Sequence, residues 1–260
     1  MSGVDRMNSQ QRLPHLLALD TSNQYCSVAL QWDGRIQAQH EWSEQKHSQM
    51  ILPMVRALMG VQNADFADLD AIVVGIGPGG FTGVRLAVAV AQGLAFAAQK
   101  PVLAYSSLAA MALAGLRQTT VTQIVIAMDA RMQQVYWAHY SLSEGDLQVV
   151  VTPSLDDVGV FANYLAGIDE PCAVAGNATT VFEPIAQACT RAPLAVAPMD
   201  HEAPHAEDLL HLANRAWHDG AWAEGVALSP EQVQPLYVRD KVAQTIAERE
   251  TAAAERVQSS

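Results

Sequence analysis

Apolar positions near the start of the chain fall into short runs that predict strands. These runs are Leu16–Leu19, Tyr25–Trp32 and Ile36–Trp42. Asp33-Gly34 joins the last two and predicts a tight hairpin, because both residues tolerate the positive φ of a type I′ turn. From Met50 to Met59 the apolar spacing changes to i, i+4, i+8, which predicts a helix.

The following pattern alternates a strand with a helix. Ala71–Val74 predicts a strand, and the glycine-rich turn Gly75–Gly80 leads from it into a helix over Thr82–Ala98. After a short strand at Val102–Leu103 and a helix at Ser107–Leu116, the order of three strands, helix, strand and helix starts again. The repeated strands are expected at Gln123–Met128, Gln134–Tyr140, Leu147–Val151 and Cys172–Ala175, and the repeated helices near Leu155–Leu165 and Thr179–Ala188.

The two halves also resemble each other in local sequence. The segment ending in Asp20, at Leu17–Asp20, can be laid over Ile126–Asp129, and each segment leads into a turn and a returning strand. We interpret this as a duplicated βββαβα unit of the ribonuclease H-like kind. Two such units face one another in the actin and sugar-kinase group, so an α/β fold with two lobes is expected. The lobes are predicted at residues 14–116 and 117–242, followed by a flexible tail at 243–260.

Composition limits the kinds of partner. Of 260 residues, 15 are basic and 27 are acidic, giving a net charge of -12. Direct binding to a phosphate backbone depends on clustered Lys and Arg, so binding of nucleic acid by the chain alone is not expected. Cys26, Cys172 and Cys189 form no CxxC pair and predict neither disulfides nor a zinc site. The polar N-terminus and the short, interrupted apolar run Leu86–Ala98 predict no membrane span, hence a cytoplasmic protein.

Gly75–Gly80 matches the GxGxxG spacing of dinucleotide-binding turns. That class also needs an acidic residue about twenty positions later, and none occurs between Asp70 and Asp129. The glycines are better explained by tight packing at a turn between strand and helix.

His201–His205 matches the HExxH pattern of zinc hydrolases. Pro204 would break the continuous helix on which such histidines sit, so we expect it to be the first residue of a following helix. No serine lies in a G-x-S-x-G elbow, which disfavours a protease or other serine hydrolase.

Two helices are candidates for a subunit interface. The helix Thr82–Ala98 has small side chains on all sides. The helix Met50–Met59 is rich in methionine, a residue common on adaptable binding surfaces. Burial of the same residues against the chain's own sheet explains the pattern equally well, and both explanations stay open at this point.

Gly77–Arg85, followed by Ala91–Ala95, resembles the TsaB family, also called YeaZ, which takes part in making threonylcarbamoyladenosine in tRNA. Further matches are Leu19–Ser22, Ile51–Val55, Met128–Met132, Val135–Ala138 and Leu236–Arg239, so the resemblance covers about residues 14 to 242.

The resemblance implies a non-catalytic subunit that binds and activates the catalytic relative TsaD, which modifies the adenosine next to the anticodon in tRNAs that read codons beginning with A. It implies TsaE, an ATPase, as a further partner, a homodimer when the chain is alone, and tRNA binding only through the complex. TsaD carries two metal-binding histidines where Ser107 and Met111 stand here, so no metal and no cofactor are expected. The residues expected at the interface are Met50, Ile51, Met54, Val55, Leu58, Leu86, Ala87, Val90, Ala91 and Leu94.

A vestigial nucleotide cleft is expected between the lobes. Its residues would be Asp20, Thr21, Ser22, Gly79, Asp129 and Gly176. The alternative is an ATP-dependent small-molecule kinase of the same fold, in which Asp20 and Asp129 supply the carboxylates. Neither turn carries the glycine that is usual in such kinases, which disfavours this alternative.

Overall fold

Two β-sheets organise the chain, and the computed structural model describes residues 12–43, 45–197, 203–218 and 227–239. The elements before the second sheet are β1 (Leu16–Asp20), β2 (Tyr25–Trp32), β3 (Arg35–Trp42), α2 (His47–Val61), η1 (Phe66–Asp68), β4 (Ala71–Gly75), α3 (Phe81–Ala98), β5 (Val102–Tyr105) and α4 (Ser107–Leu116). The remaining elements are β6 (Gln123–Asp129), β7 (Gln134–Ser143), β8 (Asp146–Asp157), α5 (Val158–Ala166), β9 (Cys172–Ala175), α6 (Ala178–Val181), α7 (Glu183–Ala188), β10 (Leu194–Val196), α8 (Ala206–His218), β11 (Ala227–Leu228) and η3 (Pro230–Gln232).

The two sheets share one topology. The first has the order β11-β5-β4-β1-β2-β3 and the second the order β10-β9-β6-β7-β8. In each, the first strand of the unit pairs antiparallel with the second and parallel with the fourth. The prediction of a duplicated α/β unit in a two-lobed fold is therefore confirmed. The hairpin at Asp33-Gly34 also has the expected geometry, with φ of 48° and 74°.

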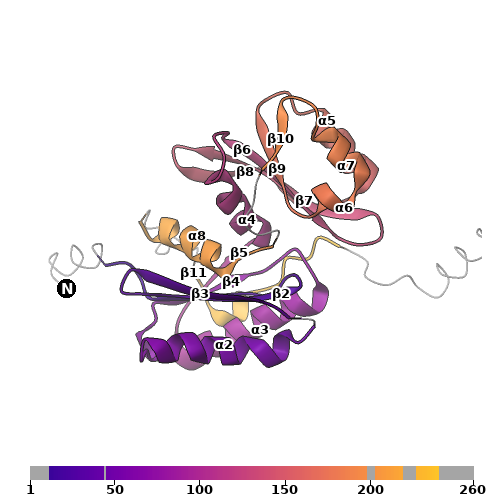
Figure 1. The fold of residues 1–260 in the computed structure, drawn as a ribbon. Coiled ribbons are helices and arrows are strands. Elements are labelled where there is room, and N and C mark those ends of the chain that lie inside the picture. Colours follow the sequence, from indigo (N-terminus) through magenta and orange to yellow (C-terminus); the bar gives the residue numbers. More distant parts are fainter. Residues whose placement is uncertain (1–11, 44, 198–202, 219–226, 240–260) are drawn as a thin grey trace, which may run out of the picture.

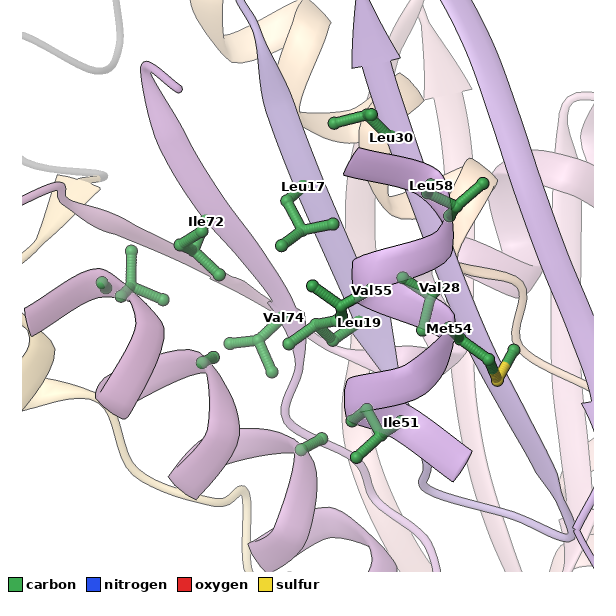
Figure 2. Packing of buried hydrophobic residues seen from close by; sticks show 14 of the residues in the cluster. Leu17, Leu19, Val28, Leu30, Ile51, Met54, Val55, Leu58, Ile72 and Val74 are labelled. Carbon is green, nitrogen blue, oxygen red and sulfur yellow. The ribbon is translucent and has the colours of Figure 1, made fainter. Parts of the chain in front are cut away.

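Helices cover both faces of each sheet (Figure 1). In the first lobe α2 and α3 pack on one face, with Leu17, Leu19, Ile72 and Val74 pointing toward them (Figure 2). Helix α8 packs on the other face, and α4 packs on the second sheet, so α4 and α8 lie between the two sheets. Helices α5 and α7 cover the outer face of the second lobe.

The end of the described chain returns to the first lobe. Helix α8 packs on β1 and β2, and β11 pairs with β5 in the first sheet. The predicted second lobe of residues 117–242 is therefore too long. Its compact part ends after β10, and the described residues 206–218 and 227–239 belong mainly to the first lobe. The amphipathic pattern of α8 gave no indication of which sheet it would cover.

Three predicted boundaries are wrong by a few residues. The expected helix at Leu155 begins only at Val158, because Leu155 still pairs with Tyr136 in the sheet. The expected helix Thr179–Ala188 is split at Phe182, whose extended backbone ends α6 and precedes α7, and Pro184 lies in the first turn of α7. Pro204 lies two residues before α8, and His201 is outside the described residues.

Helix α3 is the one helix in the described part of the chain that could cross a membrane by length and composition, with 18 residues and a mean hydropathy of 1.5. It is thus longer than the apolar run considered above. Its face bearing Ala87, Ala91 and Ala95 is fully buried in the core of the first lobe. Burial explains the apolar character of this face only, because the opposite face of α3 is exposed.

Candidate functional site

A cleft of about 980 Å³ lies between the lobes. The first lobe lines it with the turn after β1 and with the glycine-rich turn, through Ser22 and Gly79. The second lobe contributes the turn after β6, including Asp129 and Arg131. The carboxyl ends of the central strands of both sheets thus open toward one cavity, the usual position of a site in α/β proteins.

Asp20 ends β1 behind the cleft wall and is held by three hydrogen bonds. Its Oδ1 accepts from the amide of Ser22 at 2.7 Å and from Ser22 Oγ at 2.6 Å, and its Oδ2 accepts from Ser107 Oγ at 2.6 Å. Only 1% of Asp20 is exposed. Burial raises the pKa of this carboxyl above its ordinary value, although the three hydrogen bonds oppose the rise. The carboxyl is therefore enclosed by protein and does not face the cavity.

Ser107 and Met111 are both fully buried. Ser107 joins Asp20 to the glycine-rich turn, since its Oγ also accepts from the amide of Gly77 at 3.2 Å. Met111 belongs to the cluster of apolar residues that joins α4 to the second sheet. The Ser107 hydroxyl is engaged in hydrogen bonds and the Met111 thioether is packed in the core, so neither is available to hold a metal.

Asp129 lines the cleft, but its carboxylate is engaged by its own turn. The amide of Arg131 donates to Asp129 Oδ1 at 2.7 Å, and Arg131 Nη1 lies 3.2 Å from Oδ2. Asn177 Oδ1 accepts from the amide of Asp129 at 2.8 Å. Gly176, the preceding residue, has φ of +103° and lies against the carbonyl of Ala127. The second predicted aspartate is therefore ion-paired.

Close backbone contact explains the glycines of the first turn. A Cβ on Gly79 would lie 2.1 Å from the carbonyl oxygen of Ser22, and a Cβ on Gly83 would lie 2.0 Å from that of Thr21. Thr21 Oγ1 also donates to the carbonyl of Gly83 at 2.7 Å. Of the six predicted cleft residues, Ser22, Gly79 and Asp129 line the cavity, whereas Asp20, Thr21 and Gly176 lie behind it.

Sequence reasoning missed the aromatic and arginine side chains at the cleft mouth. Trp42, Phe81 and Tyr237 are exposed there, and the guanidinium carbon of Arg85 lies 3.6 Å from the centroid of the Phe81 ring. Arg239 also lines the cavity. Its segment, Leu236–Arg239, was noted only for its resemblance to a family, because the fold partners of these residues lie far away in sequence.

The predicted interface residues divide into two groups. Ile51, Met54, Val55, Leu58, Ala87 and Ala91 are buried in the core of the first lobe. Figure 2 shows the four residues of α2 turned toward the sheet residues Leu17, Leu19, Val28 and Leu30. These six predictions are corrected, because the apolar face of each helix covers its own sheet. Met50, Leu86, Val90 and Leu94 are only half-buried and can still contact another molecule.

The outward surfaces of α2 and α3 are mostly uncharged. On α3 the exposed stripe contains Thr82, Ala89, Gly93, Phe96 and Ala97, with the half-buried Leu86 and the exposed Arg85 beside them. Phe96 is 69% exposed, and so is Val61 at the end of α2. Leu52, Pro53, Ala57 and Gly60 are exposed on α2. We call this surface, formed by the exposed residues of α2 and α3, the outer helical face.

The burial of Asp20 gives a pH-dependent prediction. Its pKa is raised on folding, so the folded protein binds more protons than the unfolded chain between the two pKa values, and stability falls as pH rises through that window. Asn cannot ionise. Relative to wild type, Asp20→Asn is therefore expected to gain stability as pH rises above about 4, the ordinary pKa of an aspartate, by up to about 1.4 kcal/mol for each unit by which folding raises the pKa of Asp20. Chemical denaturation at several pH values measures this, with the exposed Asp169→Asn as control. The prediction would be contradicted if the stability of wild type increased relative to that of Asp20→Asn as pH rises.

Comparison with known proteins agrees with this geometry. The family model described as "TsaD: tRNA N6-adenosine threonylcarbamoyltransferase" matches residues 37–247. The chain is 33% identical to TsaB of Escherichia coli over 234 residues, which is 88% of this chain and 96% of that protein. It is 39% identical to TsaB of Haemophilus influenzae over 60% of this chain and 62% of that protein. The solved structure of YeaZ from Pseudomonas aeruginosa superposes with a TM-score of 0.72 at 38% identity, covering 86% of this chain and 99% of that chain.

Two sheets that share the order of five strands, with the central strand of each ending at an aspartate beside a shared cleft, define a protein of the actin-like ATPase fold. The aspartates of this one are enclosed or ion-paired. With the similarities above, the chain belongs to the TsaB family of tRNA threonylcarbamoyladenosine biosynthesis proteins, also called YeaZ.

Proposed function

We propose that this chain is a non-catalytic subunit of the machinery that transfers a threonylcarbamoyl group to adenosine in tRNA, and that it binds and activates a catalytic TsaD. The observations that carry the proposal are the enclosure of Asp20 by Ser107 behind the cleft wall and the burial of Met111 in the apolar core. Where a catalyst of this group needs accessible metal ligands or carboxylates, this chain has a hydrogen-bonded structural network.

The outer helical face is the surface that we assign to TsaD. Arg85 is the one charged residue along α3, and the face carries the exposed Phe96, whereas the overall charge of the chain is strongly negative. Small residues such as Ala89 and Gly93 allow another helix to approach closely. The same face would join two copies of this chain when TsaD is absent. TsaE would join the assembled complex, and all of this would take place in the cytoplasm.

Charge supports binding of tRNA through the complex and not through this chain alone. The net charge of -12 opposes a phosphate backbone. Arg131, one of the cations at the cleft mouth, is already paired with Asp129.

The kinase alternative needs a free carboxylate at the phosphates. Asp20 accepts three hydrogen bonds in the protein interior, and Asp129 faces the guanidinium of Arg131. Both arrangements disfavour a kinase. ATP hydrolysis by the isolated chain at rates typical of kinases, about 1 to 100 per second, would favour it.

Reconstitution tests the proposal. The purified chain, the TsaD of the same cell and their mixture are each given tRNA and the activated threonylcarbamoyl donor. Transfer is expected with the mixture and not with this chain alone, and sedimentation should show the two proteins bound to each other. Transfer by the chain alone, or a mixture that sediments as separate proteins, would overturn the proposal.

A further inference from the structure

The last described residues, Val233–Arg239, run from the first lobe across the mouth of the cleft, and we call them the strap. The strap is fixed to the first lobe at several points. Val233 is buried in the core, and the amide of Leu236 donates to the carbonyl of Ile76 at 2.8 Å. Ile76 belongs to the glycine-rich turn, so the strap is held next to the element that begins α3.

Arg239, at the end of the strap, reaches the second lobe. Its Nη2 donates to the carbonyl of Ala130 at 3.0 Å and to Gln134 Oε1 at 2.9 Å. Its guanidinium carbon lies 5.9 Å from the centroid of the Tyr136 ring. All three partners belong to the β6–β7 hairpin. The strap therefore ties the hairpin of one lobe to the glycine-rich turn of the other.

The hairpin held by Arg239 has an unusual backbone. Arg131, Met132 and Gln133 are consecutive and all left-handed, with φ of 65°, 55° and 58°. Such residues are costly outside glycine and persist only where surrounding contacts impose them. In addition, Arg239 Nε is buried and has no hydrogen-bond partner among the described residues. An unpaired buried donor and a strained turn at the same contact favour a second arrangement of the hairpin once the contact is released.

Two side chains of α3 hold the strap from its other side. Arg85 Nε donates to the hydroxyl of Tyr237 at 2.7 Å. Gln92 Nε2 donates to the carbonyls of Pro230 and Val233 at 3.0 and 3.1 Å. Ala89, on the outer helical face, lies four residues after Arg85 and three before Gln92, so it shares the same turns of the helix.

We propose that the strap couples α3 to the β6–β7 hairpin, so that a change at the outer helical face alters how firmly the two lobes are held together at the cleft. Arg85 and Gln92 position the strap, and Arg239 transmits its position to the hairpin. The coupling within the chain stands independently of the proposed function, which is needed only to say that TsaD is the molecule docking on α3.

Hydrogen exchange of the full-length chain tests the contact itself. Arg239→Met keeps the length of the stem but removes the hydrogen bonds to Ala130 and Gln134. Amides of residues 129–136 are expected to exchange at least about tenfold faster in this variant, because losing even one of these two charged hydrogen bonds has an effect of about that size. Arg191→Met, at an exposed site of the second lobe, is the matched control and should change nothing at the hairpin. Unchanged exchange in Arg239→Met would show that Arg239 does not hold the β6–β7 hairpin.

The coupling is tested from α3. Arg85→Met and Tyr237→Phe each remove the hydrogen bond between α3 and the strap, and neither residue touches the hairpin in the described contacts. Both are expected to speed exchange at residues 129–136, with melting temperatures within about 4 °C of wild type. If both variants exchange at the wild-type rate while Arg239→Met exchanges faster, Arg239 holds the hairpin but α3 is not coupled to it through the strap.

Adding TsaD separates this inference from the proposed function. Docking on the outer helical face should restrain Arg85 and Gln92, slowing exchange at residues 129–136 in wild type but not in Arg239→Met. Bound TsaD with no change at the hairpin would overturn the link between docking and the strap. If TsaD does not bind, the proposed function fails, and the single-chain variants still decide whether the strap couples α3 to the hairpin.

Discussion

Ala89→Glu should separate this protein from TsaD and from a second copy of itself without unfolding it. Ala89 is exposed in the middle of the outer helical face, and Glu is a good helix former, so the monomer should tolerate the change. In a helix-to-helix contact the same carboxylate would be taken out of water, while Arg85, the one cation on α3, already donates to Tyr237, so the change costs several kcal/mol. We expect affinity to fall by at least ~100-fold, measured by sedimentation or calorimetry.

Two further variants make this result specific. Ala91 lies two residues away on the same helix but is 0% exposed and faces the sheet, so Ala91→Glu should unfold the first lobe. Ala166→Glu, on an exposed helical position of the second lobe, should leave both folding and binding unchanged. An Ala89→Glu protein that melts normally and still binds TsaD would show that the outer helical face is not the interface.

The local pattern was enough to predict the repeat but not which face of each helix is free. Period and turn chemistry located the strands, and the Asp33-Gly34 hairpin followed from the conformations that those two residues allow. On α2 the spacing of Met50 to Met59 identifies one apolar face. In a lobe with a single sheet, the apolar face of the helix covers that sheet. Most residues of α2 that were predicted to form the interface therefore lie in the core. Helix α3 carries apolar residues on every side, and only its position against β4 distinguishes Ala89 from Ala91.

The site could be predicted only where its residues are close in sequence. Asp20 and Ser22 belong to one turn, and the glycine-rich turn is a continuous motif. The contact of Arg239 with Ala130, and that of Arg85 with Tyr237, join residues more than a hundred positions apart. Nothing in local periodicity specifies such pairs. The cleft mouth and the strap therefore emerged only with the fold.

Gly83→Ala should be among the most damaging single-methyl additions in this protein. Gly83 lies in the first turn of α3, directly against the backbone of the turn after β1, and a Cβ there would lie 2.0 Å from the carbonyl oxygen of Thr21. Backbone on both sides cannot move aside as a side-chain end could, so the turn and the helix must separate. Overpacking typically costs 1–3 kcal/mol and more where backbone must shift, so we expect a loss of about 3 kcal/mol or more.

Gly93→Ala provides the matched comparison for Gly83→Ala, because it makes the same chemical change in the same helix. Nothing lies within 4 Å of a Cβ at Gly93, which is exposed. Alanine favours a helix over glycine by up to about 1 kcal/mol, so this variant should be stabilised. Denaturant titration of the two variants beside wild type should therefore give shifts of opposite sign. Equal shifts would mean that helix propensity, and not the approach of Gly83 to Thr21, controls both positions, and that the first turn of α3 is free to move away from Asp20, Thr21 and Ser22.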